Sequence, residues 1–161
     1  MTKNLVVFFS ATGTTKRVAE NLAAAIDGDL YEIKPEVPYS NADLNWMDKN
    51  SRSTVEMKDL NSRPKISADN FSTDSYEIIF LGFPIWWYVA PTIINTFLEK
   101  HNFSNKKIVL FATSGGSRFG RTVENIRSSV AYSTEIIEGA ILNSNPSPEE
   151  LKEWVKSLHL E

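Results

Sequence analysis

The chain has 161 residues, a length that fits one domain, and 42% of them are hydrophobic, enough for one substantial core. Its 17 basic and 20 acidic residues give a net charge of −3, too balanced to favour nucleic acid or an anionic membrane as a partner. The absence of cysteine excludes disulfides, thiolate nucleophiles, Fe–S clusters and Cys-ligated zinc. We therefore expect a single domain over residues 1–161 in which any redox chemistry comes from a bound cofactor.

The amino-terminal residues predict a cytoplasmic location. Only five apolar residues, Leu5 to Phe9, follow the polar start, too few for a signal-peptide core or a membrane span. No later apolar run approaches the length of a span. We expect a soluble protein that associates with neither membranes nor nucleic acids, and the sequence leaves its oligomeric state open.

The first part of the chain predicts a strand, a helix and a second strand. Residues 4–9 form an apolar run typical of a buried strand, and residues 14–26 have helical periodicity. Gly28 is expected to end this helix in a left-handed conformation. Residues 30–34 are half polar, as expected for a short strand near the edge of a sheet. The inward residues of the helix would be Val18, Leu22, Ala25 and Ile26.

A long connection follows the second predicted strand. Roughly forty residues separate it from the next apolar run, more than a compact connection needs without structure of its own. Residues 43–60 are polar with scattered apolar side chains, and their spacing fits a helix only loosely. We predict an irregular, partly helical insertion over about residues 35–74.

The second half of the chain continues the alternation. Apolar runs predict strands at residues 76–82, 107–112 and 135–142, and helices are expected after Pro91, around 123–130 and at 148–158. The inward residues of these helices would be Ile94, Phe97, Leu98 and His101, then Val123, Ile126 and Val130, then Leu151, Trp154, Val155 and Leu158. The pattern indicates an α/β fold: a doubly wound five-stranded parallel sheet with helices on both faces.

The loop after the first strand is rich in hydroxyl groups and leads directly into a helix. It consists of Ser10, Ala11, Thr12, Gly13, Thr14 and Thr15. Hydroxyls, a glycine and the free N–H groups of a helix amino terminus together suit a phosphate. The loop matches neither a dinucleotide turn nor a nucleoside-triphosphate loop. Helix capping is the alternative, but capping needs only one such hydroxyl. We interpret the loop as a neutral site for a phosphate monoester.

The loop after the third strand concentrates aromatic side chains between two prolines. Its central residues are Pro84, Ile85, Trp86, Trp87 and Tyr88. A flat heteroaromatic ring needs stacking surfaces and a backbone held still at its edge, and aromatic residues and prolines supply both. The alternative for each aromatic residue alone is a place in the core or in a partner surface.

The loop after the fourth strand combines glycines with hydroxyl groups. Its candidate binding residues are Thr113, Ser114, Gly115, Gly116, Phe119 and Gly120. Glycines allow the backbone to approach a ligand closely, and the hydroxyls and amides suit the polar edge of a heterocycle. A plain glycine-rich connection is the alternative. Arg118 is either a cofactor contact or an ordinary surface residue.

Together the three loops resemble those of the flavodoxins in order and position. Ser10, Thr12, Gly13 and Thr15 match the family pattern Thr/Ser-x-Thr-Gly-x-Thr. The resemblance covers most of the chain and weakens across residues 35–74. It implies a flavodoxin-like fold that binds FMN non-covalently at the three loops, with the ring partly exposed for electron exchange. Trp86 resembles the family's first stacking aromatic residue, and Phe119 occupies the place of the second. Replacing Trp87 should affect a bound flavin less than replacing Trp86 if Trp87 packs inward.

Two departures from the family bear on function. Many flavodoxins have a glycine in the aromatic loop, whereas none lies between Pro84 and Ala90, so we expect positive φ to be hard to reach there. The nearly balanced charge also differs from acidic electron shuttles. Three hypotheses follow: an electron carrier that docks to a redox protein, an FMN-dependent NAD(P)H or quinone reductase, and, less favoured, a cofactor-free binding scaffold.

Two other classes fit the sequence poorly. A receiver-type signalling domain would need acidic residues after the first strand and an aspartate after the third, where Ser10 and Pro84 stand. His101 and His159 are the two histidines and do not cluster, so we expect no metal site and assign no catalytic residue.

Overall fold

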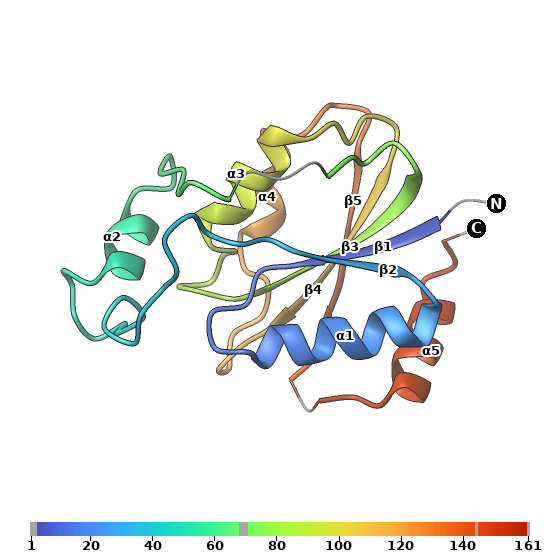
Figure 1. Cartoon of the computed structure of the whole chain (residues 1–161), viewed down its shortest axis with the longest axis horizontal. Helices are drawn as coiled ribbons and strands as arrows, with labels where there is room; N and C mark the ends of the chain where they lie inside the picture. The colour runs from blue at the N-terminus through green and yellow to red at the C-terminus, as the bar shows by residue number, and fades with distance from the viewer. Residues whose placement is uncertain (1–2, 68–70, 144, 161) are drawn as a thin grey trace.

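A computed structural model describes residues 3–67, 71–143 and 145–160 (Figure 1). Strands and helices alternate along the chain. The elements are β1 (Lys3–Phe8), α1 (Thr14–Ile26), β2 (Asp29–Glu32), α2 (Arg52–Lys58), β3 (Tyr76–Pro84), α3 (Thr92–Lys100), β4 (Lys107–Thr113), α4 (Thr122–Arg127), β5 (Glu135–Ile141) and α5 (Pro148–Ser157). The five predicted strands are confirmed, with bounds shifted by one or two residues.

The five strands pair in parallel in the order β2-β1-β3-β4-β5. The chain leaves β1 in one direction to form β2, then returns past β1 to form β3, so the winding reverses between β1 and β3. In such sheets ligands bind outside the carboxyl ends of the strands at this switch point. The predicted doubly wound, flavodoxin-like α/β fold is confirmed.

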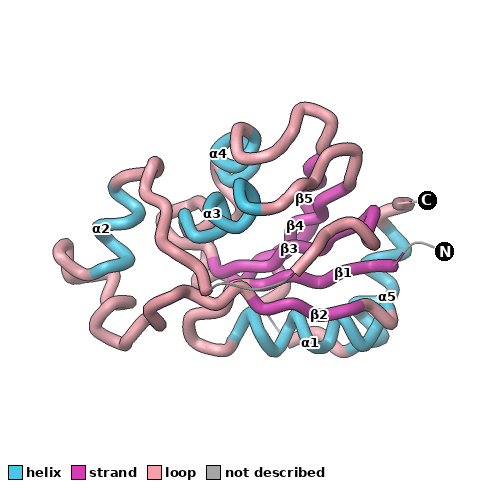
Figure 2. Tube along the Cα trace, turned by 45° about the horizontal axis from the view of Figure 1, so that its top comes forward, coloured by secondary structure: helices cyan, strands magenta, loops and turns pink. Residues whose placement is uncertain are grey.

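Helices cover both faces of the sheet (Figures 1 and 2). Helices α1 and α5 lie on one face and α3 and α4 on the other. The alternation of side chains along β1 divides the core accordingly, because Val6 and Phe8 pack with α1 and α5 while Leu5 and Val7 pack toward α3 and α4. The parallel strands are buried on both faces, which explains why they read as continuous apolar runs.

The end of α1 differs from the prediction. Asp27, not Gly28, has the left-handed conformation, with φ 52° and ψ 45°, and its N–H donates to the Ala23 carbonyl. Aspartate tolerates this conformation, so the glycine is not needed for it. Gly28 instead allows close packing, because a Cβ there would lie only 3.1 Å from the Asn4 carbonyl oxygen.

Three predicted inward residues lie outside their helices, and one of them, Leu158, is the C-cap of α5 and packs against the core. His101 follows α3 as its C-cap, with its ring centroid 4.8 Å from that of Phe97. Val130 lies beyond the end of α4 yet still packs against the core. Helices α3 and α4 are shorter than expected, but the faces they bury are those that the sequence predicts.

The insertion extends beyond the carboxyl ends of the strands (Figure 1). Its described part contains one short helix, α2, within otherwise irregular backbone, as predicted. Residues 68–70 of the predicted insertion lie outside the described residues. Among the described helices, none is long and apolar enough to cross a membrane.

Candidate functional site

A cleft of about 610 Å³ opens at the carboxyl ends of the strands. Its volume lies in the range of small-molecule and cofactor sites. All three predicted loops contribute to it, and so does the insertion. The lining residues are Ala11, Thr12, Leu44, Trp46, Ser53, Pro84, Ile85, Trp86, Trp87, Tyr88, Ser114, Gly115, Gly116 and Ser117.

Two of the four hydroxyl groups in the loop after β1 hold the loop itself. Ser10 Oγ accepts a hydrogen bond from the Gly13 N–H at 3.0 Å. Thr15 Oγ1 is buried and lies 2.8 Å from Thr113 Oγ1, which joins this loop to the end of β4. Thr12 and Thr14 are exposed, and Thr12 lines the cleft. The hydroxyls of Ser10 and Thr15 therefore hold the loop in shape, whereas those of Thr12 and Thr14 are accessible from outside.

The amino terminus of α1 lies at this same loop. Gly13 is the N-cap residue, with φ 94°, and no side chain of the described residues caps the helix there. The N–H groups of the first turn are thus left for another acceptor, and the helix dipole favours an anion. Lys16 and Arg17 are exposed in the same turn and add positive charge. The arrangement suits a phosphate group.

The aromatic loop forms a tight turn. The Trp86 N–H donates to the Val89 carbonyl at 2.9 Å, and the Val89 N–H donates to the Trp86 carbonyl at 3.2 Å. Trp87 and Tyr88 lie between them at φ 50° and 68°. Positive φ at both central positions is the pattern of a type I′ turn, which normally favours glycine or asparagine. The loop therefore adopts positive φ without glycine and carries the steric penalty that the absence of glycine predicts.

The turn is held from the neighbouring loop. The Arg121 N–H donates to the Tyr88 carbonyl at 3.2 Å. Gly120, at φ 55°, lies so close that an added Cβ would overlap the same carbonyl. Gly120 thus contributes to the site through backbone packing and does not itself line the cleft.

The two tryptophans have opposite surroundings. Trp86 is half-buried and packs edge-on against Phe9, with ring centroids 5.9 Å apart, and against Tyr39 at 5.6 Å. Trp87 is 42% exposed. Trp87 therefore does not pack inward, because the turn directs its two central residues outward and leaves Trp86 on the core side. Both rings nevertheless line the cleft.

The glycine-rich loop is stabilised by its own serines. Ser114 Oγ accepts hydrogen bonds from the N–H groups of Gly116 and Ser117, at 3.2 and 2.9 Å. Gly115 and Gly116 are exposed and line the cleft. Phe119 is only 1% exposed and packs edge-on against Phe83 in the core. It therefore presents no face to the cleft, in contrast to its expected place as a stacking residue.

Sequence reasoning missed one wall of the cleft. Leu44, Trp46 and Ser53 come from the insertion, and Ser117 comes from the glycine-rich loop. Trp46 is 70% exposed, an unusual state for so large an apolar side chain. The sequence did carry one signal of this wall: Trp46 lies in a polar segment and fits no helix face.

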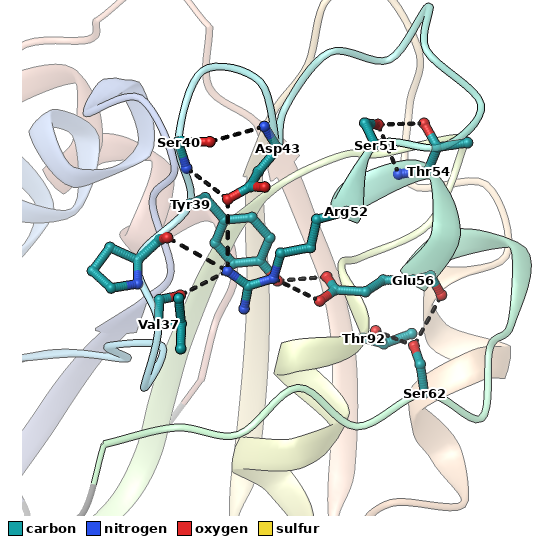
Figure 3. A network of polar contacts seen from close by, with 11 residues as sticks. Val37, Tyr39, Ser40, Asp43, Ser51, Arg52, Thr54, Glu56, Ser62 and Thr92 are labelled. Carbon is teal, nitrogen blue, oxygen red and sulfur yellow. Dashed lines mark hydrogen bonds and ion pairs between the residues drawn. The ribbon is translucent and has the colours of Figure 1, made fainter.

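A polar network within the insertion is centred on Arg52 and Tyr39 (Figure 3). Arg52 donates from Nε to Glu56 at 3.1 Å and from Nη1 to the Val37 carbonyl at 2.7 Å, and its guanidinium lies 3.8 Å from the Tyr39 ring centroid. The Tyr39 hydroxyl donates to the other oxygen of Glu56 at 2.5 Å. Burial, with this hydrogen bond, raises the pKa of Tyr39 well above its ordinary value. Because Tyr39 also packs on Trp86, the network positions both walls of the cleft.

The cleft is electrically neutral along its walls. Every one of the described residues that line it is uncharged. Arg118 is exposed but is not part of the lining. Within the described ranges, no group of three or more His, Cys, Asp or Glu residues is placed to hold a metal ion. The site therefore combines a positively charged end at the amino terminus of α1 with an uncharged, aromatic interior.

Comparison with known proteins agrees with this arrangement. The family model described as flavodoxin matches residues 3–158. The chain belongs to the flavodoxin family. A curated relative in this family, the flavodoxin-like domain-containing protein BilS of Clostridioides difficile (strain CD3), is 28% identical over 160 residues, which cover 97% of this chain and 73% of the relative.

The chain is also similar to proteins of known structure. A protein of Bacteroides uniformis ATCC 8492, provisionally named a flavoprotein, is 45% identical with a TM-score of 0.89, over 96% of this chain and 98% of the other. A flavoprotein of Lactobacillus acidophilus NCFM, whose structure is a complex with FMN, is 24% identical with a TM-score of 0.69, over 96% and 99% of the two chains. At this lower identity the likeness shows the fold alone.

We expect Tyr39 to make stability sensitive to alkaline pH. The pKa of Tyr39 is raised in the folded state. Its contribution to the free energy of unfolding is therefore complete below pH ~10, the ordinary pKa of tyrosine, and is lost as the pH rises from there toward the folded-state pKa. The free energy of unfolding should fall by up to about 1.4 kcal/mol per pH unit in this range, and by less where solvent screens the phenol. Urea unfolding of wild type and Tyr39→Phe between pH 7 and about 12 measures it.

The Tyr39→Phe variant should lose about 1 kcal/mol at neutral pH through the missing hydrogen bond and should show a shallower alkaline decline. Tyr76, whose pKa is raised to about 12 by burial and its hydrogen bond to Asp29, provides the control. Because Tyr76 is more exposed, Tyr76→Phe should change the decline less. Equal alkaline slopes in wild type and Tyr39→Phe would contradict the assigned role of Tyr39.

The surroundings of the two tryptophans predict different costs of truncation. Trp86→Ala removes a half-buried ring from contact with Phe9 and Tyr39 and should lower the free energy of unfolding by about 2–4 kcal/mol. Trp87→Ala removes an exposed ring and should change it by less than about 1 kcal/mol. Urea denaturation of the two variants without added ligand tests this, and the reverse order would show that the turn is placed wrongly by one residue.

Proposed function

We propose that the protein binds one FMN non-covalently in this cleft and transfers electrons through it. The observation that carries the proposal is the uncapped amino terminus of α1 at the end of an uncharged, aromatic cleft. The family assignment supports a flavin, and the L. acidophilus relative was solved with FMN itself. When bound, FMN would supply the reversible uptake of electrons that the side chains lack.

The residues around α1 fit a phosphate monoester. The N–H groups that follow Gly13 and the exposed Thr12 hydroxyl would donate hydrogen bonds to its oxygens. Lys16 and Arg17 would balance its charge from the outer side of the helix. Ser10 and Thr15 would act indirectly, because their hydroxyls already hold the loop in shape.

The other walls fit a flat ring. Trp86 would offer a stacking surface that the contacts with Phe9 and Tyr39 hold in place. The glycine-rich loop supplies exposed backbone at Gly115 and Gly116, which permits close approach to the polar edge of the ring. Phe119 is left out of this proposal because it is buried in the core.

The electron partner has two candidates. A carrier would dock to a redox protein, whereas a reductase would pass electrons between NAD(P)H or a quinone and the flavin. The uncharged lining favours a small uncharged acceptor such as a quinone, because charged walls that would attract a charged partner are absent from the described lining residues. The exposed rings of Trp46, Trp87 and Tyr88 at the cleft add surface on which a flat molecule can stack.

The phosphate assignment predicts a difference between FMN and riboflavin. Thr12→Val keeps the shape of the side chain and removes its hydroxyl, so the dissociation constant for FMN should rise about tenfold or more. The constant for riboflavin should change by less than about twofold. Isothermal calorimetry measures both, with Thr96→Val, in α3, as a control that should leave both unchanged. Equal affinity of wild type for FMN and riboflavin would refute the phosphate site.

The neutral cleft predicts how salt affects electron transfer. The FMN-loaded protein, reduced anaerobically, should be reoxidised by an uncharged benzoquinone at a rate that hardly changes up to about 1 M salt, where the Debye length falls to about 3 Å. Stopped-flow absorbance of the flavin measures this rate. NADH and NADPH are tested separately as reductants of the oxidised form. If the quinone does not react while a charged redox protein reoxidises the flavin at a salt-dependent rate, the carrier function is correct.

A further inference from the structure

Ser53 has a buried hydroxyl group that the folded chain does not use. The residue lies in the first turn of α2, is 2% exposed and lines the cleft. Its Oγ has no hydrogen-bond partner among the described residues. A buried hydroxyl without a partner costs free energy, so each such group in a native structure calls for an explanation.

The hydroxyl groups of three neighbouring residues, Ser51, Thr54 and Ser62, are satisfied. Ser51 Oγ lies 2.9 Å from Thr54 Oγ1 and accepts from the Thr54 N–H. Ser62 Oγ donates to the Glu56 carbonyl at 2.9 Å and lies 2.8 Å from Thr92 Oγ1. Among Ser51, Ser53, Thr54 and Ser62, Ser53 is thus the exception, and it is also the one of these residues that lines the cleft.

The backbone of Ser53 is fixed in place. Its N–H donates to the Asp43 carbonyl at 2.9 Å, and the adjacent Arg52 is bound to Glu56 and to the Val37 carbonyl. Figure 3 shows how Arg52 spans from α2 to the chain around Val37 and Tyr39. With the backbone held, the hydroxyl can change partners only by rotation about its single side-chain bond. The cleft is the place where a new partner can be bound.

The chemistry of the lining limits what that partner is. All the described lining residues are uncharged, and the phosphate end of the proposed site lies at α1. We propose that Ser53 hydrogen-bonds a neutral polar group of the bound flavin, on its ring or its ribityl chain, so that the insertion forms a fourth element of the binding site. This inference rests on the proposed function, namely that the cleft binds FMN.

The variant Ser53→Ala tests the inference with two flavins. The dissociation constants for FMN and for riboflavin should both rise by the same factor, about three- to tenfold, because the lost bond is to a part that the two molecules share. The melting temperature without flavin should stay the same or increase, because the substitution removes an unpaired buried hydroxyl. Calorimetry and thermal unfolding give the two readouts.

Ser62→Ala is the matched control. Ser62 lies in the same insertion, but its hydroxyl is already paired and it does not line the cleft. This variant should lower the melting temperature and leave both flavin affinities unchanged. A lower melting temperature of Ser53→Ala with unchanged affinities would assign Ser53 a purely structural role and overturn the inference.

Two further outcomes separate this inference from the proposed function. If Ser53→Ala weakens FMN but not riboflavin, Ser53 acts at the phosphate and the inference is wrong while FMN binding stands. If wild type binds neither flavin, the proposed function itself fails. A parallel loss for both flavins, with Thr12→Val affecting FMN alone, would place the two hydroxyls at opposite parts of the ligand as inferred.

Discussion

Parallel pairing of all five strands is the constraint on which the rest of the structure depends. It brings every strand's carboxyl end to one edge of the sheet, and the reversal of winding between β1 and β3 leaves a crevice there. The loops after β1, β3 and β4 must meet at this crevice although more than a hundred residues separate the first from the last. The Thr15–Thr113 hydroxyl pair shows how closely they join. The site is thus a consequence of strand order, and the loop residues decide its chemistry.

The insertion contributes to the cleft at the carboxyl ends of the strands. The three loops line the crevice together with Leu44, Trp46 and Ser53 of the insertion. Such a long irregular segment needs anchoring, because its own apolar core is small. The pairing of Arg52 with Glu56 and the stacking of Arg52 on Tyr39 supply the anchor, and Tyr39 carries it to Trp86. A substitution that disrupts this network should therefore also alter the position of Trp86 in the aromatic wall of the cleft.

The sequence predicts the fold well and the site in part, for identifiable reasons. Apolar runs and helical periodicity locate the strands, because burial on both faces leaves a strong local signal. The orientation of Trp86 and Trp87 depends on turn geometry and on contacts with Phe9 and Tyr39, which lie far away in sequence. Phe119 looks like a loop residue, yet Gly120 and the Tyr88 carbonyl fix its backbone so that the ring enters the core. Long-range contacts of this kind have no local signature.

The aromatic turn shows what the site gains from a strained backbone. Left-handed φ costs a residue with a Cβ about 1–2 kcal/mol, and a glycine turn would avoid that cost at Trp87 and Tyr88. The Trp86–Val89 pair and the Arg121 N–H hold the turn against the strain. A glycine turn would follow the same backbone path but would present no side chains, whereas this one directs two large rings outward at the cleft. Stability is therefore exchanged for aromatic surface at the place where the proposed ring and its electron partner would meet.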